Sequence, residues 1–372
     1  MIRIMEFIIK DKVFLVAMIF AVFSMFITTP SLAYLDYVNW KVLIIMFTIM
    51  IAVSGIYETH FFDYVATKLV MHLKNIKWVG LVIVLVTFFL AMLLTNDAVL
   101  LTLIPFTIFI TKHTHQEKHA ITILILQTIA ANMGSALTPM GDPQNIYLYA
   151  YFNIPFSSFL SVTFPITLMG LLLIVTTLLI RIPSSTCELN ITTPVVDLRR
   201  LFLYLLILIN ALLNILRIVP ELYTLIITLI LVMIYGRHLL RRVDFHLLLT
   251  FLAFFIFTGN LSQIQNVQIF VSQLLNTRYS IFFSGLFVSQ LISNVPTAVL
   301  LSTFTPVYLW QPLLQGVNIG AMGSIIASLA SLITFKYVLR DYHQQIKHYL
   351  IQYTILCIIF IIIISTVVLI FF

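Results

Sequence analysis

Polar and small residues interrupt two apolar stretches of the chain that are long enough to cross a membrane. In the first stretch, residues 119–150, the interruption contains Asn132, Gly134, Thr138, Gly141, Asp142 and Asn145. In the second stretch, residues 315–335, the interruption contains Asn318, Gly320 and Ser324. Polar backbone at bilayer depth is tolerated only where it lines protein or a water-filled cavity. Two breaks at corresponding positions therefore predict a site for a transported solute.

Two further apolar stretches are each divided by a short polar tip. The tip within residues 78–111 contains Thr95, Asn96 and Asp97. The tip within residues 279–309 contains Ser293, Asn294 and Thr297. The arms on either side are about 14 to 17 residues long, shorter than the ~20 residues of a full span, which favours two re-entrant hairpins.

The residue types at the breaks and tips suit both a solute and an ion. A helix that is broken inside the membrane exposes N–H groups at one new end and carbonyl groups at the other. The N–H end attracts anions and the carbonyl end attracts cations. Amide oxygens of Asn and hydroxyls of Ser and Thr are neutral ligands for Na⁺ or partners for a carboxylate. The alternative is that these side chains only form hydrogen bonds between helices, as is common in membrane bundles.

Two carboxylates fall within the predicted membrane depth, where a charge is costly and usually functional. Asp97 and Asp142 could each bind Na⁺ or carry a proton. Asp142 has a second, compatible interpretation, because Asp followed by Pro143 is typical of a helix N-cap with proline at the first helical position. We expect a Na⁺ site close to Asn96, Asp97, Thr138 and Asn294.

The composition indicates a protein built from membrane-spanning helices. Hydrophobic residues make up 61% of the 372 positions and charged residues only 9%, which excludes a water-soluble globular domain. We predict an all-α polytopic membrane protein with two broken transmembrane helices, at 119–150 and 315–335, and further apolar spans at 13–28, 39–56, 157–180, 201–217, 221–235, 247–262 and 349–372. Residues 57–77 and 263–278 are more polar and predict helices along the membrane surface.

The basic residues predict the orientation in the membrane. The net charge is +7, but Lys and Arg are spread over short connecting segments rather than one stripe, which excludes a nucleic-acid-binding surface. Cytoplasmic loops carry an excess of Lys and Arg. That excess falls on one side if the N-terminus is cytoplasmic, in segments 1–12, 57–77, 112–118, 181–200, 236–246 and 336–348. We therefore expect a multi-pass protein of the cell membrane with a cytoplasmic N-terminus.

Hairpin tip and broken span recur in the same order in both halves of the chain. We predict a first repeat at 1–181, a linker and connecting span at 182–218, and a second repeat at 219–372. Each tip leads into the same four residues, Ala-Val-Leu-Leu, at 98–101 and at 298–301. In the predicted orientation the first hairpin enters from the cytoplasm and the second from outside, so the repeat is inverted. An inverted repeat has two nearly equivalent conformations, as alternating access requires.

Three segments carry a resemblance to a known family: Thr-Asn-Asp-Ala-Val at 95–99, Gly-Ser-Ala-Leu-Thr-Pro-Met-Gly-Asp-Pro-Gln-Asn at 134–145, and Ser-Asn-Val-Pro at 293–296. With them the chain resembles the ion transporter superfamily, and within it the arsenical-pump and citrate-transporter-like anion permeases, which have a divalent anion:sodium symporter type of fold. The resemblance implies a scaffold domain, a moving transport domain, a homodimer, and a solute and ion bound near both tips and both breaks.

The chain departs from the sodium–dicarboxylate carriers of that superfamily in three ways. Those carriers have Ser-Asn-Thr at both tips, whereas this chain has Thr95-Asn96-Asp97 and Ser293-Asn294-Val295. The second break lacks the proline of the first, and Asp142 has no counterpart in it. We also expect no arginine at the site, which leaves helix ends and Asn side chains to bind an anion.

These observations predict a secondary active transporter of a small inorganic or organic anion, coupled to Na⁺ or H⁺, with elevator-like alternating access and no resident cofactor. A Na⁺/H⁺ antiporter is the nearest alternative, because Asp97 and Asp142 would suit it. A passive channel is a further alternative. An intramembrane aspartyl hydrolase that uses the same two carboxylates is the one enzymatic alternative.

Overall fold

The computed structural model describes residues 12–187 and 191–370, and this part of the chain is almost entirely helical, with no β-strand. The elements in chain order are α2 (Lys12–Met25), α3 (Tyr34–Tyr37), α4 (Trp40–Glu58), α5 (Phe61–Val70), α6 (Ile76–Leu93), α7 (Asn96–His113), α8 (Glu117–Ser135), α9 (Pro143–Tyr151), α10 (Phe156–Arg181), α11 (Leu198–Ile215), α12 (Glu221–Tyr235), η1 (Arg237–Arg242), α13 (Phe245–Ser262), α14 (Gln265–Leu274), α15 (Arg278–Ile292), α16 (Asn294–Ser302), η2 (Val307–Leu309), α17 (Trp310–Gly320), α18 (Leu329–Asp341), η3 (His343–Gln345) and α19 (Ile346–Ile370).

Seven of the described helices are long and apolar enough to cross a membrane: α4, α6, α8, α10, α11, α13, and α19 together with the short turn before it. The prediction of an all-α polytopic membrane protein is confirmed. Helices α2 and α12, which we also predicted as spans, are apolar but shorter than the usual ~20 residues. Helices α5 and α14 lie within the two stretches predicted as surface helices.

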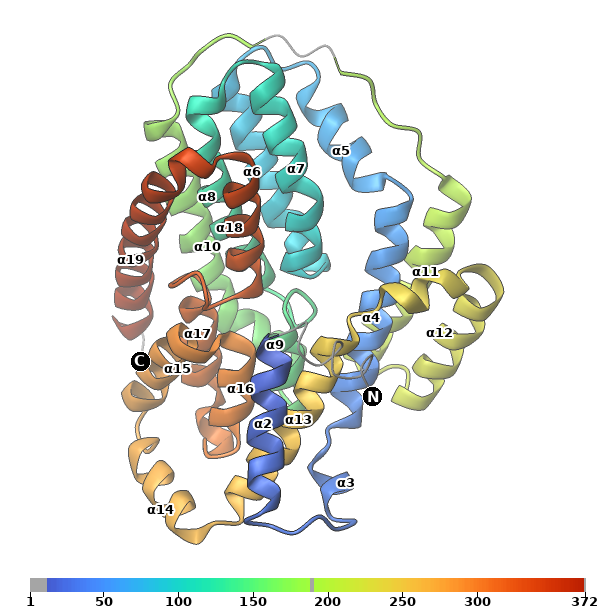
Figure 1. The fold of residues 1–372 in the computed structure, drawn as a ribbon, viewed down its shortest axis with the longest axis vertical. Helices are drawn as coiled ribbons and strands as arrows, with labels where there is room; N and C mark the ends of the chain where they lie inside the picture. The colour runs from blue at the N-terminus through green and yellow to red at the C-terminus, as the bar shows by residue number, and fades with distance from the viewer. Residues whose placement is uncertain (1–11, 188–190, 371–372) are drawn as a thin grey trace.

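The two hairpins lie at opposite ends of the molecule, and their tips face each other near mid-height. Helices α6 and α7 occupy the upper half of Figure 1, whereas α15 and α16 occupy the lower half. Helices α6 and α7 have 18 residues each, which is longer than the predicted arms, whereas α15 has 15 and α16 has 9. Helix α7 is longer than its predicted arm because polar residues at its outer end, such as Lys112 and His113, continue the helix beyond the apolar stretch.

The two broken helices cross between the hairpins in opposite directions. The first runs down from α8 to α9, and the second runs up from α17 to α18 (Figure 1). The second begins at Trp310 and ends at Asp341, so it extends past the predicted range of 315–335 at both ends. The apolar stretch marked only its core, because the outer turns carry polar and charged residues.

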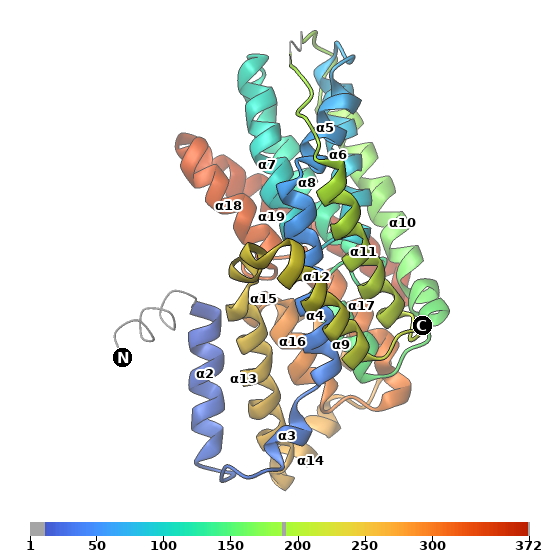
Figure 2. The same cartoon turned by 90° about the vertical axis from the view of Figure 1, so that its right-hand side faces the viewer.

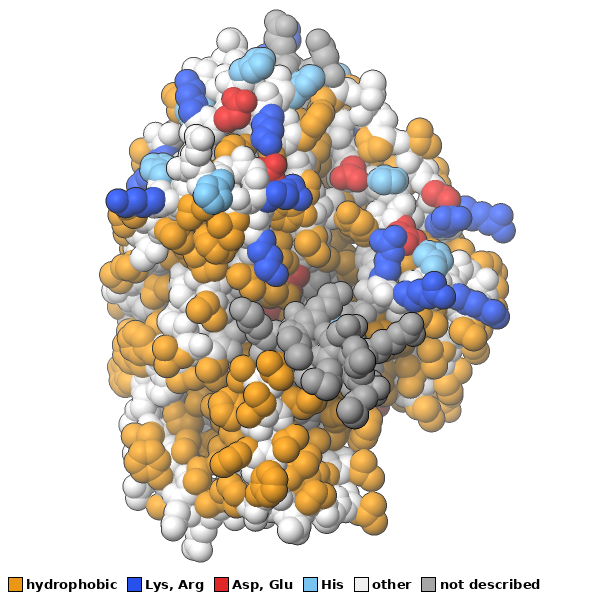
Figure 3. Space-filling view, in the orientation of Figure 1, with side chains coloured by type: hydrophobic (Ala, Val, Ile, Leu, Met, Phe, Trp, Pro, Cys, Tyr) orange, Lys and Arg blue, Asp and Glu red, His pale blue; other side chains and the backbone are white. Residues whose placement is uncertain are grey.

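Other helices flank this arrangement. Helix α2 lies alongside α13, and α11 lies alongside α4 (Figures 1 and 2). In the face drawn in Figure 3, Lys and Arg gather over the upper part of the molecule, whereas the lower part shows mainly apolar and neutral side chains. This one-sided charge is the pattern from which the orientation was predicted.

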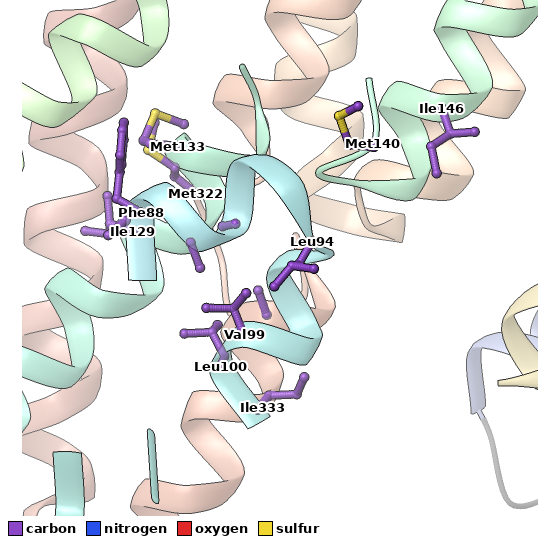
Figure 4. Close-up of a cluster of buried hydrophobic side chains, with 14 of the residues drawn as sticks. Phe88, Leu94, Val99, Leu100, Ile129, Met133, Met140, Ile146, Met322 and Ile333 are labelled. Atoms are coloured by element: carbon purple, nitrogen blue, oxygen red, sulfur yellow. The ribbon is translucent and has the colours of Figure 1, made fainter. Parts of the chain in front are cut away.

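Tight apolar packing fixes the tip end of the first hairpin. Figure 4 shows Phe88 of α6 beside Ile129 and Met133 of α8, and Val99 and Leu100 of α7 near the tip; all five side chains are buried. Helix α8 approaches α6 so closely at Gly134 that an added Cβ would lie 2.0 Å from the carbonyl oxygen of Phe88. Only glycine permits this approach, so Gly134 sets how the broken helix meets the hairpin.

Candidate binding site between two hairpin tips and two helix breaks

A backbone hydrogen bond joins each hairpin tip to one helix break. The N–H of Asn96 donates to the carbonyl of Gly141 at 3.1 Å, and the N–H of Asn294 donates to the carbonyl of Ala327 at 2.8 Å. In both cases the tip residue starts a helix, and the carbonyl lies two residues before the helix that follows the break. The two halves of the site are therefore built in the same way.

The first half of the site is closed by its own polar groups. Asn96 Nδ2 donates to Asp142 Oδ2 at 2.7 Å and to Asn132 Oδ1 at 3.2 Å. The Asn96 Oδ1 atom accepts from the backbone N–H of Asp97 at 2.8 Å. Ser135 Oγ donates to the same Asp142 oxygen at 3.4 Å. Since Asn96 and Asp142 are 2% and 3% exposed, each bond compensates a polar group that water does not reach.

Asp142 holds the predicted N-cap position of α9, with Pro143 as the first helical residue, but its side chain makes no capping hydrogen bond. The capping interpretation is thus right for the backbone position and wrong for the carboxylate. The carboxylate turns to Asn96 at the opposing tip.

The second half leaves one polar group open. Asn294 Oδ1 accepts from the backbone N–H of Val295 at 2.8 Å and from Ser293 Oγ at 3.2 Å. Asn294 Nδ2 has no partner among the described residues, although the residue is only 2% exposed. The backbone at Ser293 adopts φ 75° and ψ 157°, a region that costs a non-glycine residue energy and that clusters at functional sites.

Ser328 takes the place of Asp142 in the second half. It lies ten positions after Asn318, as Asp142 lies ten positions after Asn132. Its side chain caps α18 by accepting from the N–H of Ser331 at 3.2 Å. We expected no residue equivalent to Asp142 in the second break. Ser328 does occupy the equivalent position, but it offers a neutral hydroxyl rather than a carboxylate.

The two breaks also contact each other across the centre of the molecule. Asn132 Nδ2 donates to Ser328 Oγ at 3.3 Å. Asn318 Nδ2 donates to Asn145 Oδ1 at 2.8 Å, and Gln144 Nε2 donates to Asn318 Oδ1 at 3.4 Å. These bonds join residues that lie 173 to 196 positions apart in the sequence, and they hold four helix ends around one point.

One cavity, which we call the central cavity, lies at this point. Both tips and both breaks contribute polar side chains to its wall: Asn96, Asp97, Asp142, Ser293, Asn294 and Ser328. Asp97 Oδ1 is buried and has no hydrogen-bond partner among the described residues. Asp244, which caps α13, adds a third carboxylate to the wall.

An adjoining cavity shares Asp97 and Asp244 with the central cavity and is also lined by Ser54, Thr95 and Arg242. No arginine of the described residues lines the central cavity itself, so Arg242 is an addition beside the two half-sites rather than within them. Arg242 belongs to the short helix η1, and its Nη2 lies 2.8 Å from Glu58 Oε1. In the sequence, Arg242 is one of several basic residues in a short loop, and we used it only to predict the orientation in the membrane. No sequence pattern showed that this loop folds back towards the first tip.

The other predicted residues support the site without lining either cavity. Thr138 Oγ1 donates to the carbonyl of Met92, and Thr297 Oγ1 donates to that of Ser293 at 2.7 Å. Ser324 is held by Gln290, which accepts from its N–H at 2.7 Å. The close-packed glycines Gly134, Gly141 and Gly320 leave no room for a side chain.

Comparison with known proteins assigns the chain to a family of membrane transporters. The family model described as "Citrate transporter" matches residues 1–313, and the chain belongs to this family. It is 34% identical to an uncharacterized transporter of Methanocaldococcus jannaschii over 300 aligned residues. These residues cover 80% of this chain and 81% of that protein.

Two further relatives are more distant. The inner membrane protein YbiR of Escherichia coli K12 is 27% identical over 301 residues, which cover 80% of each protein. An uncharacterized transporter of Mycobacterium tuberculosis H37Rv is 28% identical over 152 residues, which cover 41% of this chain and 35% of that protein. The family and the names of these relatives indicate a membrane transporter rather than an enzyme.

Proposed function

We propose that this protein is a secondary active transporter of a small inorganic or organic anion, coupled to Na⁺ or H⁺. The observation that carries the proposal is the central cavity, to which both hairpin tips and both helix breaks contribute polar side chains. A transport site at the junction of two repeats is built from discontinuous helices in this way. The citrate transporter family supports an anion as the solute.

Matched contacts support an inverted repeat and hence alternating access. Positions 96 and 294 at the tips lie 198 residues apart, as do Phe88 and Leu286 in the first arms. Gly134 meets the Phe88 carbonyl, and Gly320, which lies 186 residues later, meets the Leu286 carbonyl. Equivalent packing in two opposed hairpins allows the molecule to exchange their roles. An elevator-like movement of hairpins and broken helices against the remaining spans would open the cavity to each side in turn.

The charges around the central cavity support coupling to a cation. Asp97, Asp142 and Asp244 line it, and no Lys or Arg of the described residues does. Two like charges 4 Å apart repel by about 4 kcal/mol at an effective dielectric constant of 20. An anion can therefore enter only when Na⁺ or protons neutralise these carboxylates. The dependence of solute binding on a cation is the basis of symport.

Two buried polar atoms without hydrogen-bond partners suggest which half of the site binds the cation and which binds the anion. Asp97 Oδ1 is a buried acceptor without a partner, as a Na⁺ or proton site requires, and Asn96 and Asp142 lie beside it. Asn294 Nδ2 is a buried donor without a partner at the start of α16, as an anion site requires. We propose that the cation binds in the first half and the anion reaches the second.

A Na⁺/H⁺ antiporter is the second candidate, because three carboxylates at one cavity suit two competing cations. Proton movement that Na⁺ drives in proteoliposomes without any added anion would support the antiporter.

We also propose how the transporter is placed and assembled. It lies in the cell membrane with its N-terminus in the cytoplasm, and it forms a homodimer. Its two repeats are residues 1–181 and 219–372.

The proposal is tested by uptake into proteoliposomes of purified protein. Radiolabelled citrate, succinate, sulfate, phosphate and arsenite are offered one at a time, each under an inward Na⁺ gradient, an inward proton gradient, or neither. We expect at least one anion to accumulate against its own gradient only when one of the cation gradients is present. Equal uptake with and without both gradients, or unitary currents in a planar bilayer, would contradict coupled transport.

A further inference from the structure

A third cavity with polar lining residues lies apart from the central cavity, where one end each of α8, α10 and α19 meet. Its lining residues are Thr122, Arg181, His348, Ile351, Gln352 and Ile355. Arg181 is the last residue of α10, and His348 is the third residue of α19. The cavity therefore opens at the ends of apolar spans, at the level where a bilayer changes from hydrocarbon to headgroups.

The basic groups at this cavity are uncompensated. Arg181 and His348 are both exposed, and neither forms an ion pair within the described residues. By contrast, nearby Lys112 and Arg340 are both paired with Asp341. An unpaired cationic side chain at the rim of a cavity between spanning helices suits a phosphate.

Gln352 adds an unsatisfied acceptor inside the cavity. Its Nε2 donates to Thr122 Oγ1 at 2.8 Å, which fixes the direction of the amide. Its Oε1 is buried without a partner, and the residue is 8% exposed. Gln352 lies four residues after His348, so it sits about 6 Å deeper along α19. A group that fills the cavity must bring a hydrogen-bond donor to this depth.

The outer wall of the cavity is apolar and unprotected. Ile351 and Ile355 are 51% and 49% exposed, and Ile180, next to Arg181, is 78% exposed. Side chains of this kind on the outside of a spanning helix contact acyl chains. The cavity thus combines a phosphate-binding rim, a donor requirement in its interior and an apolar outer surface. This combination suits a phospholipid whose headgroup turns into the cavity while its acyl chains stay outside.

We propose that this cavity binds the headgroup of an anionic phospholipid that carries hydrogen-bond donors, as phosphatidylglycerol does. The phosphate lies against Arg181 and His348, and the terminal glycerol of the headgroup turns into the cavity, where one of its hydroxyls donates to Gln352 Oε1. One acyl chain then follows Ile351 and Ile355 along α19. Such a lipid would tie α10 to α19, and it would do so independently of what the central cavity transports.

The proposal is tested by native mass spectrometry of the detergent-purified protein with phosphatidylglycerol and phosphatidylcholine in turn. Phosphatidylcholine has the phosphate but no donor in its headgroup. We expect the wild type to retain phosphatidylglycerol in preference. The variant Arg181→Gln should weaken that binding about fivefold, the effect of one basic residue near a lipid surface. Gln352→Met should weaken it while leaving the apolar wall intact.

The matched control is Arg199→Gln, because Arg199 is also exposed but lies outside the cavity on α11. Its phosphatidylglycerol binding should equal that of the wild type. Equal binding by Arg181→Gln and wild type would overturn the proposal, as would equal retention of the two lipids. Binding of inorganic phosphate that depends on Arg181, with no retained lipid, would show a free-anion site and would overturn the lipid as occupant.

Discussion

Asn96 Nδ2 lies 2.7 Å from Asp142 Oδ2, so a residue of the first hairpin tip holds the carboxylate of the first helix break. The equivalent amide of the second tip, Asn294 Nδ2, has no partner among the described residues. Ser328, which replaces Asp142, instead caps its own helix. The two halves of the site therefore share a backbone arrangement and differ in charge.

Replacing the carboxylate of Asp142 should uncouple transport without unfolding the protein. Asp142→Asn keeps the size of the side chain and an acceptor for Asn96, but it removes the charge that a cation would neutralise. We expect gradient-driven uptake in proteoliposomes to fall about 10- to 100-fold, the usual loss when a group that holds a cation ligand in place is removed. Asp36→Asn, at an exposed site on α3, is the control. Wild-type uptake by Asp142→Asn would place coupling elsewhere.

The two glycines where broken helices meet hairpins should differ in their tolerance of a methyl group. A Cβ at Gly134 would lie 2.0 Å from the Phe88 carbonyl oxygen, whereas a Cβ at Gly320 would lie 2.9 Å from that of Leu286. Gly134→Ala should destabilise the fold by about 3 kcal/mol and Gly320→Ala by about 1 kcal/mol, at the two ends of the range for overpacking. Thermal unfolding in detergent would measure the order, and equal midpoints would contradict the close approach at Gly134.

The cap of α18 should contribute measurably to stability. Ser328 Oγ accepts from the Ser331 N–H at 3.2 Å and from Asn132 Nδ2 at 3.3 Å. Ser328→Ala should cost about 1 kcal/mol, as loss of a serine N-cap does, and should lower uptake less than Asp142→Asn because no charge is lost. Ser157→Ala, at an exposed position on α10, should change neither. A larger loss of uptake for Ser328→Ala than for Asp142→Asn would contradict the proposed division of roles.

An ion pair between the ends of α7 and α18 should make stability depend on acid. Burial raises the pKa of Asp341, but hydrogen bonds from Lys112 at 3.0 Å and Arg340 at 2.8 Å outweigh it, so that the pKa lies below its usual value. The stabilisation is therefore present above the pKa of an unfolded Asp, about 3.9, and is lost as the pH falls through the lower pKa of the folded state.

The test of this ion pair is the difference in unfolding midpoint between the wild type and Asp341→Asn as a function of pH. At pH 7 the wild type should be more stable by about 1 kcal/mol, as a partly exposed ion pair allows. The difference should shrink once the pH is lowered towards 3. A difference that does not change with pH would show that the charge of Asp341 contributes nothing.

The sequence predicted the arrangement of helices well because each landmark has a local physical cause. Apolar length indicated the spans, and the polar tip at Asn96 and the break at Asp142 stand out against apolar neighbours. Pro143 marked where α9 begins. The outer ends of α7 and α18 were missed, since helices there continue into charged turns that hydropathy assigns to loops.

The missed residues of the site depend on contacts that no local pattern encodes. Arg242 reaches the adjoining cavity only because η1 folds back onto α4, where Glu58 holds it. Asp244 lines the central cavity because α13 begins beside both tips. Ser328 was within reach of sequence reasoning, since it lies as far from Asn318 as Asp142 lies from Asn132, but a lone serine in an apolar chain gives a weak signal.

The central claim, that both hairpin tips serve one transport site, is tested most directly by comparing Asn96→Ala, Asn294→Ala and the exposed control Asn266→Ala in gradient-driven anion uptake. All three are first shown to be folded by their elution as a single species in size-exclusion chromatography. We predict that each tip variant abolishes uptake while Asn266→Ala retains it. Uptake at the wild-type rate by either folded tip variant would contradict a site that is shared between the two tips.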